Sequence, residues 1–212
     1  LILSHDHYDH LDVPTIHYLA QRVQHYLVPL GVKARLVEMG VPADRIEELD
    51  WWQSRKVGAV HITSTPSQHF SGRTLNDRND TLWSSWVIQS GEQRIFYSGD
   101  SGYFSGFKQI GERFGGFDLA LMENGAYNDY WPSVHMTPEQ SVQAFTDLRG
   151  KVLYAVHNSP FDLAFHTWHD PLARIAELSA APQLTRAPPL IGEVPTLGPP
   201  RPTVRRWAGL RG

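Results

Sequence analysis

The stretch His5-Asp-His7-Tyr-Asp9-His10, directly after the apolar run Leu1-Ile-Leu3, decides the fold assignment. It places three imidazoles and the Asp9 carboxylate within six residues. Histidine is the commonest metal ligand in proteins, and aspartate adds a harder oxygen donor. His5 and His7 point to one side if the backbone stays extended, and a turn after them brings Asp9 and His10 toward a second ion. The segment predicts a binuclear metal site at a strand end; a solvated turn that is merely rich in histidine is the alternative.

The pattern H-x-H-x-D-H after an apolar strand resembles the signature of the metallo-β-lactamase superfamily. The resemblance implies an α/β fold, a four-layer α/β/β/α sandwich. It also implies three more ligands from distant strand ends: a histidine, a bridging acidic residue and another histidine. Apolar runs end at His69, Asp100 and His157, in that order. Because α/β sheets present side chains to a cleft at their strand ends, these three residues are the expected partners of the opening cluster.

The expected ligands form two groups that share one carboxylate. One ion is expected on His5, His7 and His69, and the other on Asp9, His10 and His157, with Asp100 bridging them. A nitrogen and oxygen donor set with many imidazoles suits two Zn²⁺ ions, with Mn or Fe as alternatives. Two ions roughly 3.5–4 Å apart would share a water and lower its pKa toward about 7. The resulting hydroxide would attack phosphorus or a carbonyl carbon.

Other strings resemble the branch that contains N-acyl-phosphatidylethanolamine phospholipase D and its bacterial homologues. They are TPSQHFSGR at 65–73, SGDSGY at 98–103, GAY at 125–127, HMTPE at 135–139, and the tail segments 191–193 and 197–198. This resemblance implies a phosphodiesterase acting on a lipid-like or small organic phosphodiester. Asp9, Asp100 and His135 are the expected catalytic residues. Arg73, Tyr127 and His135 are expected to contact the substrate, Arg73 through its phosphate.

Three other functions remain open at this stage. A lactonase or another ester or amide hydrolase would use the same hydroxide. A non-catalytic remnant would bind metal without turning over a substrate. A nuclease shares the metal motif, but the formal charge of -3 and the isoelectric point of about 6.4 give no reason to expect nucleic acid as a partner.

The domain is expected to span residues 1–181, followed by a Pro/Gly-rich tail over 182–212. The chain starts at Leu1 in mid-strand, so we expect it to be truncated at its N-terminus. A longer parent or a partner chain is then expected to cover the open sheet. With no cysteine it has neither disulfides nor thiolate ligands. No apolar stretch approaches the roughly 20 residues of a membrane span. We expect a soluble protein of the bacterial cytoplasm or periplasm, and membrane contact stays open.

Local patterns predict the main elements. Helices are expected over 13–24, 32–39, 103–114, 137–148 and 170–179, the fourth opened by the capping box Thr137-Pro-Glu-Gln140. Strands are expected over 26–29, 57–64, 82–89, 94–98, 119–122 and 151–157. Residues 44–50 are expected in a surface turn and Trp51-Trp52 in a sheet. Asp6 is expected either to support a ligand imidazole or to lie exposed in the turn.

Overall fold

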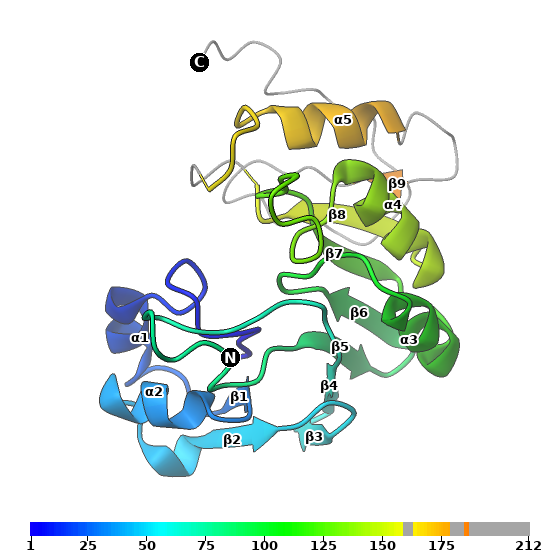
Figure 1. Ribbon diagram of the computed structural model, residues 1–212. Helices are drawn as coiled ribbons and strands as arrows, with labels where there is room; N and C mark the ends of the chain where they lie inside the picture. The colour runs from blue at the N-terminus through cyan, green and yellow to red at the C-terminus, as the bar shows by residue number, and fades with distance from the viewer. Residues whose placement is uncertain (159–162, 179–184, 187–212) are drawn as a thin grey trace.

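A large sheet of seven strands forms the centre of the molecule. The structure, a computed structural model, describes residues 1–158, 163–178 and 185–186 (Figure 1). The strands of the large sheet, in spatial order, are β3 (Ser54–Val57), β4 (Val60–Thr65), β5 (Ser85–Ser90), β6 (Gln93–Tyr97), β7 (Leu119–Glu123), β8 (Val152–Val156) and β9 (Thr185–Arg186). Pairing is antiparallel from β3 to β6 and parallel from β6 to β9. The parallel half requires crossover connections, and helices supply them.

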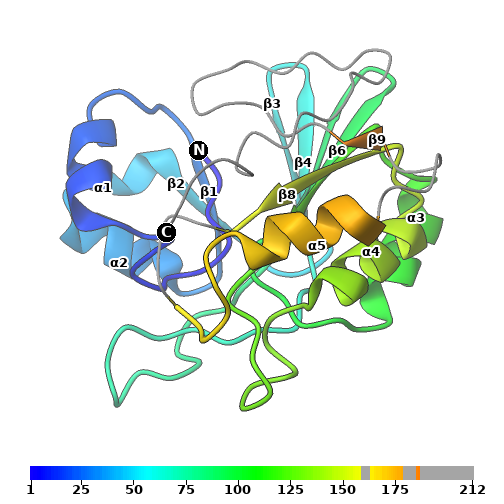
Figure 2. The ribbon, with the colours of Figure 1, turned by 90° about the horizontal axis from the view of Figure 1, so that it is seen from above.

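Three helices cover one face of this sheet. They are α3 (Gly106–Phe114), α4 (Pro138–Asp147) and α5 (Asp170–Leu178). Figure 2 shows all three on the same side of β8. The core between them and the sheet contains the alternate residues Val87, Phe96, Ala120, Met122 and Leu153, all at most 1% exposed. The capping box expected at Thr137 is present and fixes the start of α4 next to the end of β7.

A small sheet and two helices lie on the other face (Figure 2). The strands are β1 (Tyr26–Pro29) and β2 (Ile46–Leu49), which are parallel, and the helices are α1 (Val13–Leu19) and α2 (Val32–Glu38). A 3₁₀ turn over Ala43–Arg45 leads into β2. The opening segment extends this sheet, because Ile2 forms a parallel bridge with Leu27.

The two sheets meet through a third apolar cluster, built on Leu27, Leu49 and Trp86. The layers therefore run helix, sheet, sheet, helix, which confirms the four-layer α/β/β/α sandwich. Trp86 is fully buried, and its Nε1–H donates to the Leu3 carbonyl at 2.8 Å. This bond ties the segment that leads to His5 onto the large sheet.

The small sheet covers the large one only in part. Ile62, Ile88 and Ile95 are neighbours in register across β4, β5 and β6 on the face turned toward the small sheet. All three remain partly exposed, whereas Val87 and Phe96 on the helix face are fully buried. The expectation that a longer parent or a partner chain covers this face stays a prediction.

Some local expectations were wrong. Residues 44–50 are not a surface turn, because Ile46 and Leu49 are buried and β2 pairs with β1. Trp51 and Trp52 lie in a turn rather than in a sheet, and Trp52 has a φ of 70°. The expected irregular tail contributes β9 to the large sheet. Its remaining part, including 191–193 and 197–198, lies outside the described residues. No helix in the described part of the chain combines the length and apolar character needed to cross a membrane.

Candidate metal centre

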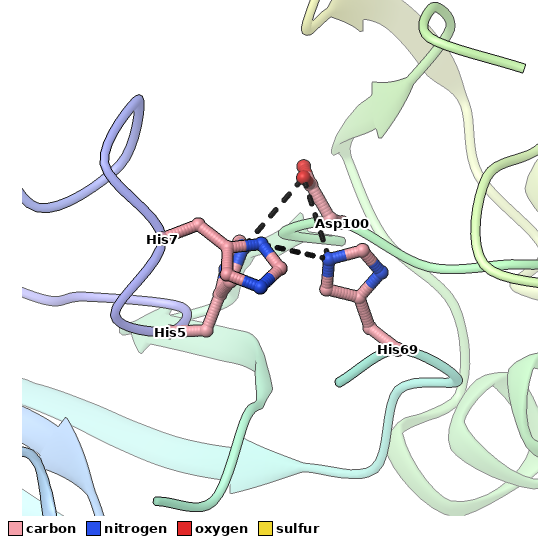
Figure 3. Close-up of side chains that lie close together, drawn as sticks. All are labelled: His5, His7, His69 and Asp100. Carbon is pink, nitrogen blue, oxygen red and sulfur yellow. Dashed lines mark hydrogen bonds and ion pairs between the residues drawn. The ribbon is translucent and has the colours of Figure 1, made fainter. Parts of the chain in front are cut away.

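Four strand-end segments bring the seven expected ligands together. The opening cluster follows residues 1–3, His69 follows β4, Asp100 follows β6 and His157 follows β8. Figure 3 shows His5 and His7 facing His69, with Asp100 above them. The opening cluster, His69, Asp100 and His157 are far apart in sequence and meet at one edge of the large sheet, as the sequence predicted.

The first donor group consists of His5, His7, His69 and Asp100, whose donor atoms lie within 4.8 Å of one another. His5 Nε2 lies 2.9 Å from His7 Nδ1, and His69 Nε2 lies 3.3 Å from the same atom. Asp100 Oδ2 is 3.7 Å from both His5 Nε2 and His69 Nε2. Three ring nitrogens and one carboxylate oxygen therefore surround one point.

The second donor group consists of Asp9, His10, Asp100 and His157, also within 4.8 Å. Asp100 Oδ2 lies 3.0 Å from His10 Nε2 and 3.3 Å from His157 Nε2. Asp9 Oδ2 lies 3.4 Å from His10 Nε2 and 3.2 Å from His157 Nε2. Both groups contain Asp100, the residue that the sequence analysis expects to bridge the two ions.

Other contacts fix which nitrogen of His5 and of His69 faces the centre. His5 Nδ1 is 3.0 Å from Ser4 Oγ, and His69 Nδ1 is 2.9 Å from the Val134 carbonyl. Partners of this kind on the far nitrogen set the tautomer and the ring orientation of metal-binding histidines. His157 has a φ of 57°, an uncommon backbone state for a residue other than glycine, at the point where the chain leaves β8.

The ionised groups of the site favour the binding of a cation. Burial alone would lower the pKa of His10, but the charge of Asp100, together with the close carboxylate of Asp9, outweighs it and raises that pKa to about 10. Burial lowers the pKa of His69 to about 3. Burial would raise the pKa of Asp100, yet His10 and His157 hold it well below its ordinary value. The carboxylates are thus ionised and draw positive charge into the second donor group.

The donor set fits a metal ion. Asp100 Oδ1 and His10 Nε2 are buried side-chain atoms without a hydrogen bond in the described structure, although His10 Nε2 lies close to two carboxylates. Buried polar atoms are normally satisfied, and such exceptions at a functional site point to an ion. Imidazole nitrogens with carboxylate oxygens are the ligands of Zn²⁺ and related transition metals.

A family model described as "Beta-lactamase superfamily domain" matches residues 1–158. This chain belongs to the metallo-β-lactamase superfamily. Among solved structures, this superfamily member is similar to the metallo hydrolase Igni18 from Ignicoccus hospitalis. The TM-score is 0.66 at 17% identity, with 88% of this chain and 74% of that chain covered. Membership places the chain among metal-dependent hydrolases.

Two curated relatives of this superfamily member match over most of its length. Uncharacterized protein Rv0906 of Mycobacterium tuberculosis is 46% identical over 207 residues, which cover 95% of this chain and 55% of that protein. N-acyl-phosphatidylethanolamine-hydrolyzing phospholipase D 1 of Caenorhabditis elegans is 33% identical over 194 residues, which cover 85% of this chain and 54% of that protein. The chain thus spans about half the length of both relatives.

Arg73 binds the backbone of the ligand loop, the segment from Asp6 to Leu11, in this metallo-β-lactamase-type domain. Its Nη1 donates to the carbonyls of Asp6 and Leu11 at 2.7 and 2.8 Å, and its guanidinium lies 4.0 Å from the centre of the Tyr8 ring. These carbonyls lie at either end of the loop that carries His7, Asp9 and His10, so Arg73 has a structural role here; its expected phosphate contact stays a prediction. This role left no signal in the sequence.

Asp6 is neither an exposed turn residue nor in contact with a ligand imidazole through any described hydrogen bond. It is fully buried, and its Oδ1 accepts from the Gly72 backbone N–H at 2.8 Å. Its Oδ2 lies 3.7 Å from Arg35 Nε. Asp6 therefore anchors the loop around residue 72 to the ligand loop.

The two remaining residues expected to contact the substrate, Tyr127 and His135, lie on the loop after β7. Tyr127 is half-buried, its hydroxyl lies 3.3 Å from Asp170 Oδ2, and its ring stacks on His166 at 4.4 Å. Burial, with Asp170 nearby, raises the pKa of Tyr127 to about 12, which keeps its hydroxyl protonated. His135 lies beside the donor groups, with its ring 5.1 Å from His69 and 5.4 Å from His157.

One buried residue at this site was not predicted. Glu123 ends β7 and belongs to a third group of possible donors with His135 and His157. The sequence held a signal for it, because the apolar run Leu119-Ala-Leu-Met ends in this acidic residue, just as other runs end in His69, Asp100 and His157.

Replacing Gly99 with alanine will destabilise the fold and weaken cation binding. Gly99 has a φ of +57°, and an added Cβ would lie 2.6 Å from Ser4 Cβ and 3.0 Å from the Ser84 carbonyl oxygen. We expect about 1–3 kcal/mol of destabilisation from the overpacking, and a zinc titration should show weaker binding because Ser4 precedes His5 and Gly99 precedes Asp100. Gly91 is the matched control, with a φ of +58° and open space around it. Equal effects of G99A and G91A would contradict this explanation.

Proposed function

We propose that this domain is a binuclear, zinc-dependent phosphodiesterase of the phospholipase D type. The observation that carries the proposal is the pair of donor groups sharing Asp100, each with its own histidines. The relatives add the substrate class, because proteins of C. elegans and of Saccharomyces cerevisiae, each 33% identical to this chain, are named as N-acyl-phosphatidylethanolamine-hydrolyzing phospholipases D.

In this proposal His5, His7 and His69 hold one ion, and Asp9, His10 and His157 hold the other, with Asp100 between them. Bound ions at such a site supply Lewis acidity and lower the pKa of a bound water. Ser4 and the Val134 carbonyl hold the imidazoles of His5 and His69 in position, so the donor atoms need little rearrangement before binding. Asp9 and Asp100 contribute the negative charge that balances the cations.

Aromatic side chains next to the loop after β7 favour a lipid-like substrate. Tyr130 is 84% exposed and Phe165 is 80% exposed. Their rings lie 6.5 Å apart, and Trp131 lies 6.4 Å from Phe165. Contiguous exposed apolar side chains are a feature of ligand-binding grooves and membrane-contact sites. Tyr127 and Trp131 lie on the same loop, with the Trp131 indole N–H bound to the Ala126 carbonyl at 2.7 Å.

Turnover of a phosphodiester with and without metal tests the proposal. The zinc-loaded chain should hydrolyse bis(4-nitrophenyl) phosphate, and an N-acyl-phosphatidylethanolamine in mixed micelles should be cleaved to phosphatidic acid. Removing the metal should abolish both activities, and added Zn²⁺ should restore them. Unchanged turnover after chelation contradicts a metal-dependent mechanism. Turnover of a lactone but of neither phosphodiester contradicts the phosphodiesterase assignment and favours a lactonase. Bound zinc without turnover of any substrate indicates a non-catalytic remnant.

A further inference from the structure

The loop after β7 carries aromatic side chains next to the metal centre. We call residues 126–134 the aromatic loop, because Tyr127, Tyr130 and Trp131 lie within it. Tyr130 is 84% exposed, and its ring lies 6.5 Å from the exposed ring of Phe165. A side chain this exposed packs little against the core, so it does not hold the loop. The contacts at the two ends of the aromatic loop decide where its rings lie.

One end of the aromatic loop is fixed against the segment of His157, which belongs to the second donor group. The Asn124 backbone N–H donates to the Val156 carbonyl at 3.0 Å, and the Asn124 side chain donates to the Pro171 carbonyl at 2.8 Å. A Cβ added at Gly125 would lie 2.1 Å from the His157 carbonyl oxygen. Glycine permits so close an approach of two backbone segments. The loop therefore starts in direct contact with the His157 segment.

The other end of the aromatic loop is held by two consecutive side chains that follow β4. Gln68 Nε2 donates to the Ser133 carbonyl at 2.7 Å. His69 Nδ1 lies 2.9 Å from the next carbonyl, that of Val134. His69 belongs to the first donor group, so the aromatic loop extends from the segment of one donor group to a residue of the other.

Gln68 lies outside both donor groups. Its backbone N–H donates to Ser101 Oγ at 2.9 Å, and its carbonyl accepts from the Gly102 N–H at 2.8 Å. These two bonds use the main chain and remain when the side chain changes. A Cβ added at Gly102 would lie 2.0 Å from the Ser133 carbonyl oxygen, so that carbonyl is tightly enclosed. Gln68 is thus a well-placed support for the aromatic loop that is not itself a candidate metal ligand.

We propose that Gln68 is the positioning residue of the aromatic loop, and that the loop held in this place selects phosphodiesters with an apolar substituent. This inference rests on the proposed phosphodiesterase activity. A phosphodiester bound between the two donor groups lies beside the loop, because the loop is fixed to the segments of His157 and His69. Tyrosine and tryptophan rings bury a large apolar area and so favour an alkyl chain. Gln68 acts on the substrate only through the position of these rings.

Two esters with the same leaving group test this role. Methyl and octyl 4-nitrophenyl phosphate undergo the same chemical step in the zinc-loaded chain and differ only in the alkyl chain. The wild type should prefer the octyl ester by about ten-fold or more in kcat/KM, mainly through a lower KM, because each buried methylene tightens binding several-fold. Gln68→Met keeps the length of the side chain but removes the amide donor. It should lose most of this preference, with kcat on the methyl ester unchanged.

Gln109→Met, at an exposed position of α3, is the matched control and should match the wild type on both esters. Tyr130→Ala removes an exposed ring of the aromatic loop and should also lower the preference for the octyl ester. Equal losses of kcat on both esters in Q68M overturn the proposal, because they indicate damage at the adjacent His69 rather than a displaced loop. An unchanged octyl preference in Q68M overturns it as well.

A second readout uses the metal-free chain and needs no turnover. Hydrogen exchange followed by mass spectrometry reports how readily the backbone N–H groups of a segment open to solvent. Peptides that cover residues 126–134 should exchange faster in Q68M than in the wild type or in Q109M. Equal exchange in Q68M and the wild type overturns the positioning role. Faster exchange in Q68M, together with a wild type that hydrolyses neither ester, contradicts the proposed function and, with it, the substrate assigned to the loop.

Discussion

Replacing Asp100 with asparagine will remove both cation binding and hydrolysis. Asp100 Oδ2 lies 3.0 and 3.3 Å from the Nε2 atoms of His10 and His157, and 3.7 Å from those of His5 and His69. One oxygen thus joins imidazoles of both donor groups, and the amide removes the charge that holds them around a cation. Changes to residues that only support a ligand cost about 10–100-fold in metal affinity or activity. We expect a larger loss here, measured as bound metal per chain and as kcat.

Asp118→Asn is the matched control for this experiment. Asp118 is an aspartate near the start of β7 whose Oδ1 pairs with the exposed Lys151 at 2.8 Å. Surface pairs of this kind contribute about 0–1 kcal/mol, so the control should bind metal and turn over substrate as the wild type does. A D100N chain that retains the full complement of metal and full turnover would show that Asp100 does not join the two groups.

Replacing Trp86 with alanine will give the largest loss of stability. Trp86 is fully buried between the two sheets, and its indole N–H binds the Leu3 carbonyl at 2.8 Å. Truncating a buried tryptophan costs about 3–5 kcal/mol through the lost contacts and the cavity. The free energy of unfolding should be measured by denaturant titration of the metal-free chain, since bound metal would add its own stabilisation.

Two further variants separate the causes of the Trp86 effect. Trp86→Phe keeps most of the packing but leaves the buried Leu3 carbonyl without its donor, which costs about 1–3 kcal/mol. Leu75→Ala, at a fully exposed side chain, should change stability by at most about 0.5 kcal/mol. Because Leu3 leads into His5, W86F should also weaken zinc binding. Equal stability of W86A and L75A would contradict the inter-sheet role of Trp86.

The candidate metal ligands could be placed from the sequence because each segment that carries them follows an apolar run. His69, Asp100 and His157 come directly after or shortly after β4, β6 and β8, and these strands end at one edge of one sheet. Residues whose role is set by contacts across the fold could not be read in this way. Arg73 binds carbonyls of a loop more than 60 residues away, and Asp6 binds the backbone of Gly72. Nothing local distinguishes these two from exposed polar residues.

The sequence by itself predicted the sandwich, through a motif that resembles a known superfamily, and it predicted the candidate ligands, because the spacing of donor residues after apolar runs is a local property of the chain. Only the tertiary structure decided that β2 pairs with β1, that Trp86 ties the opening segment to the large sheet, and that Gln68 binds the loop after β7. Each of these contacts joins side chains or strands that are remote in sequence, and their free energy depends on burial and distance, which exist only once the two sheets have packed.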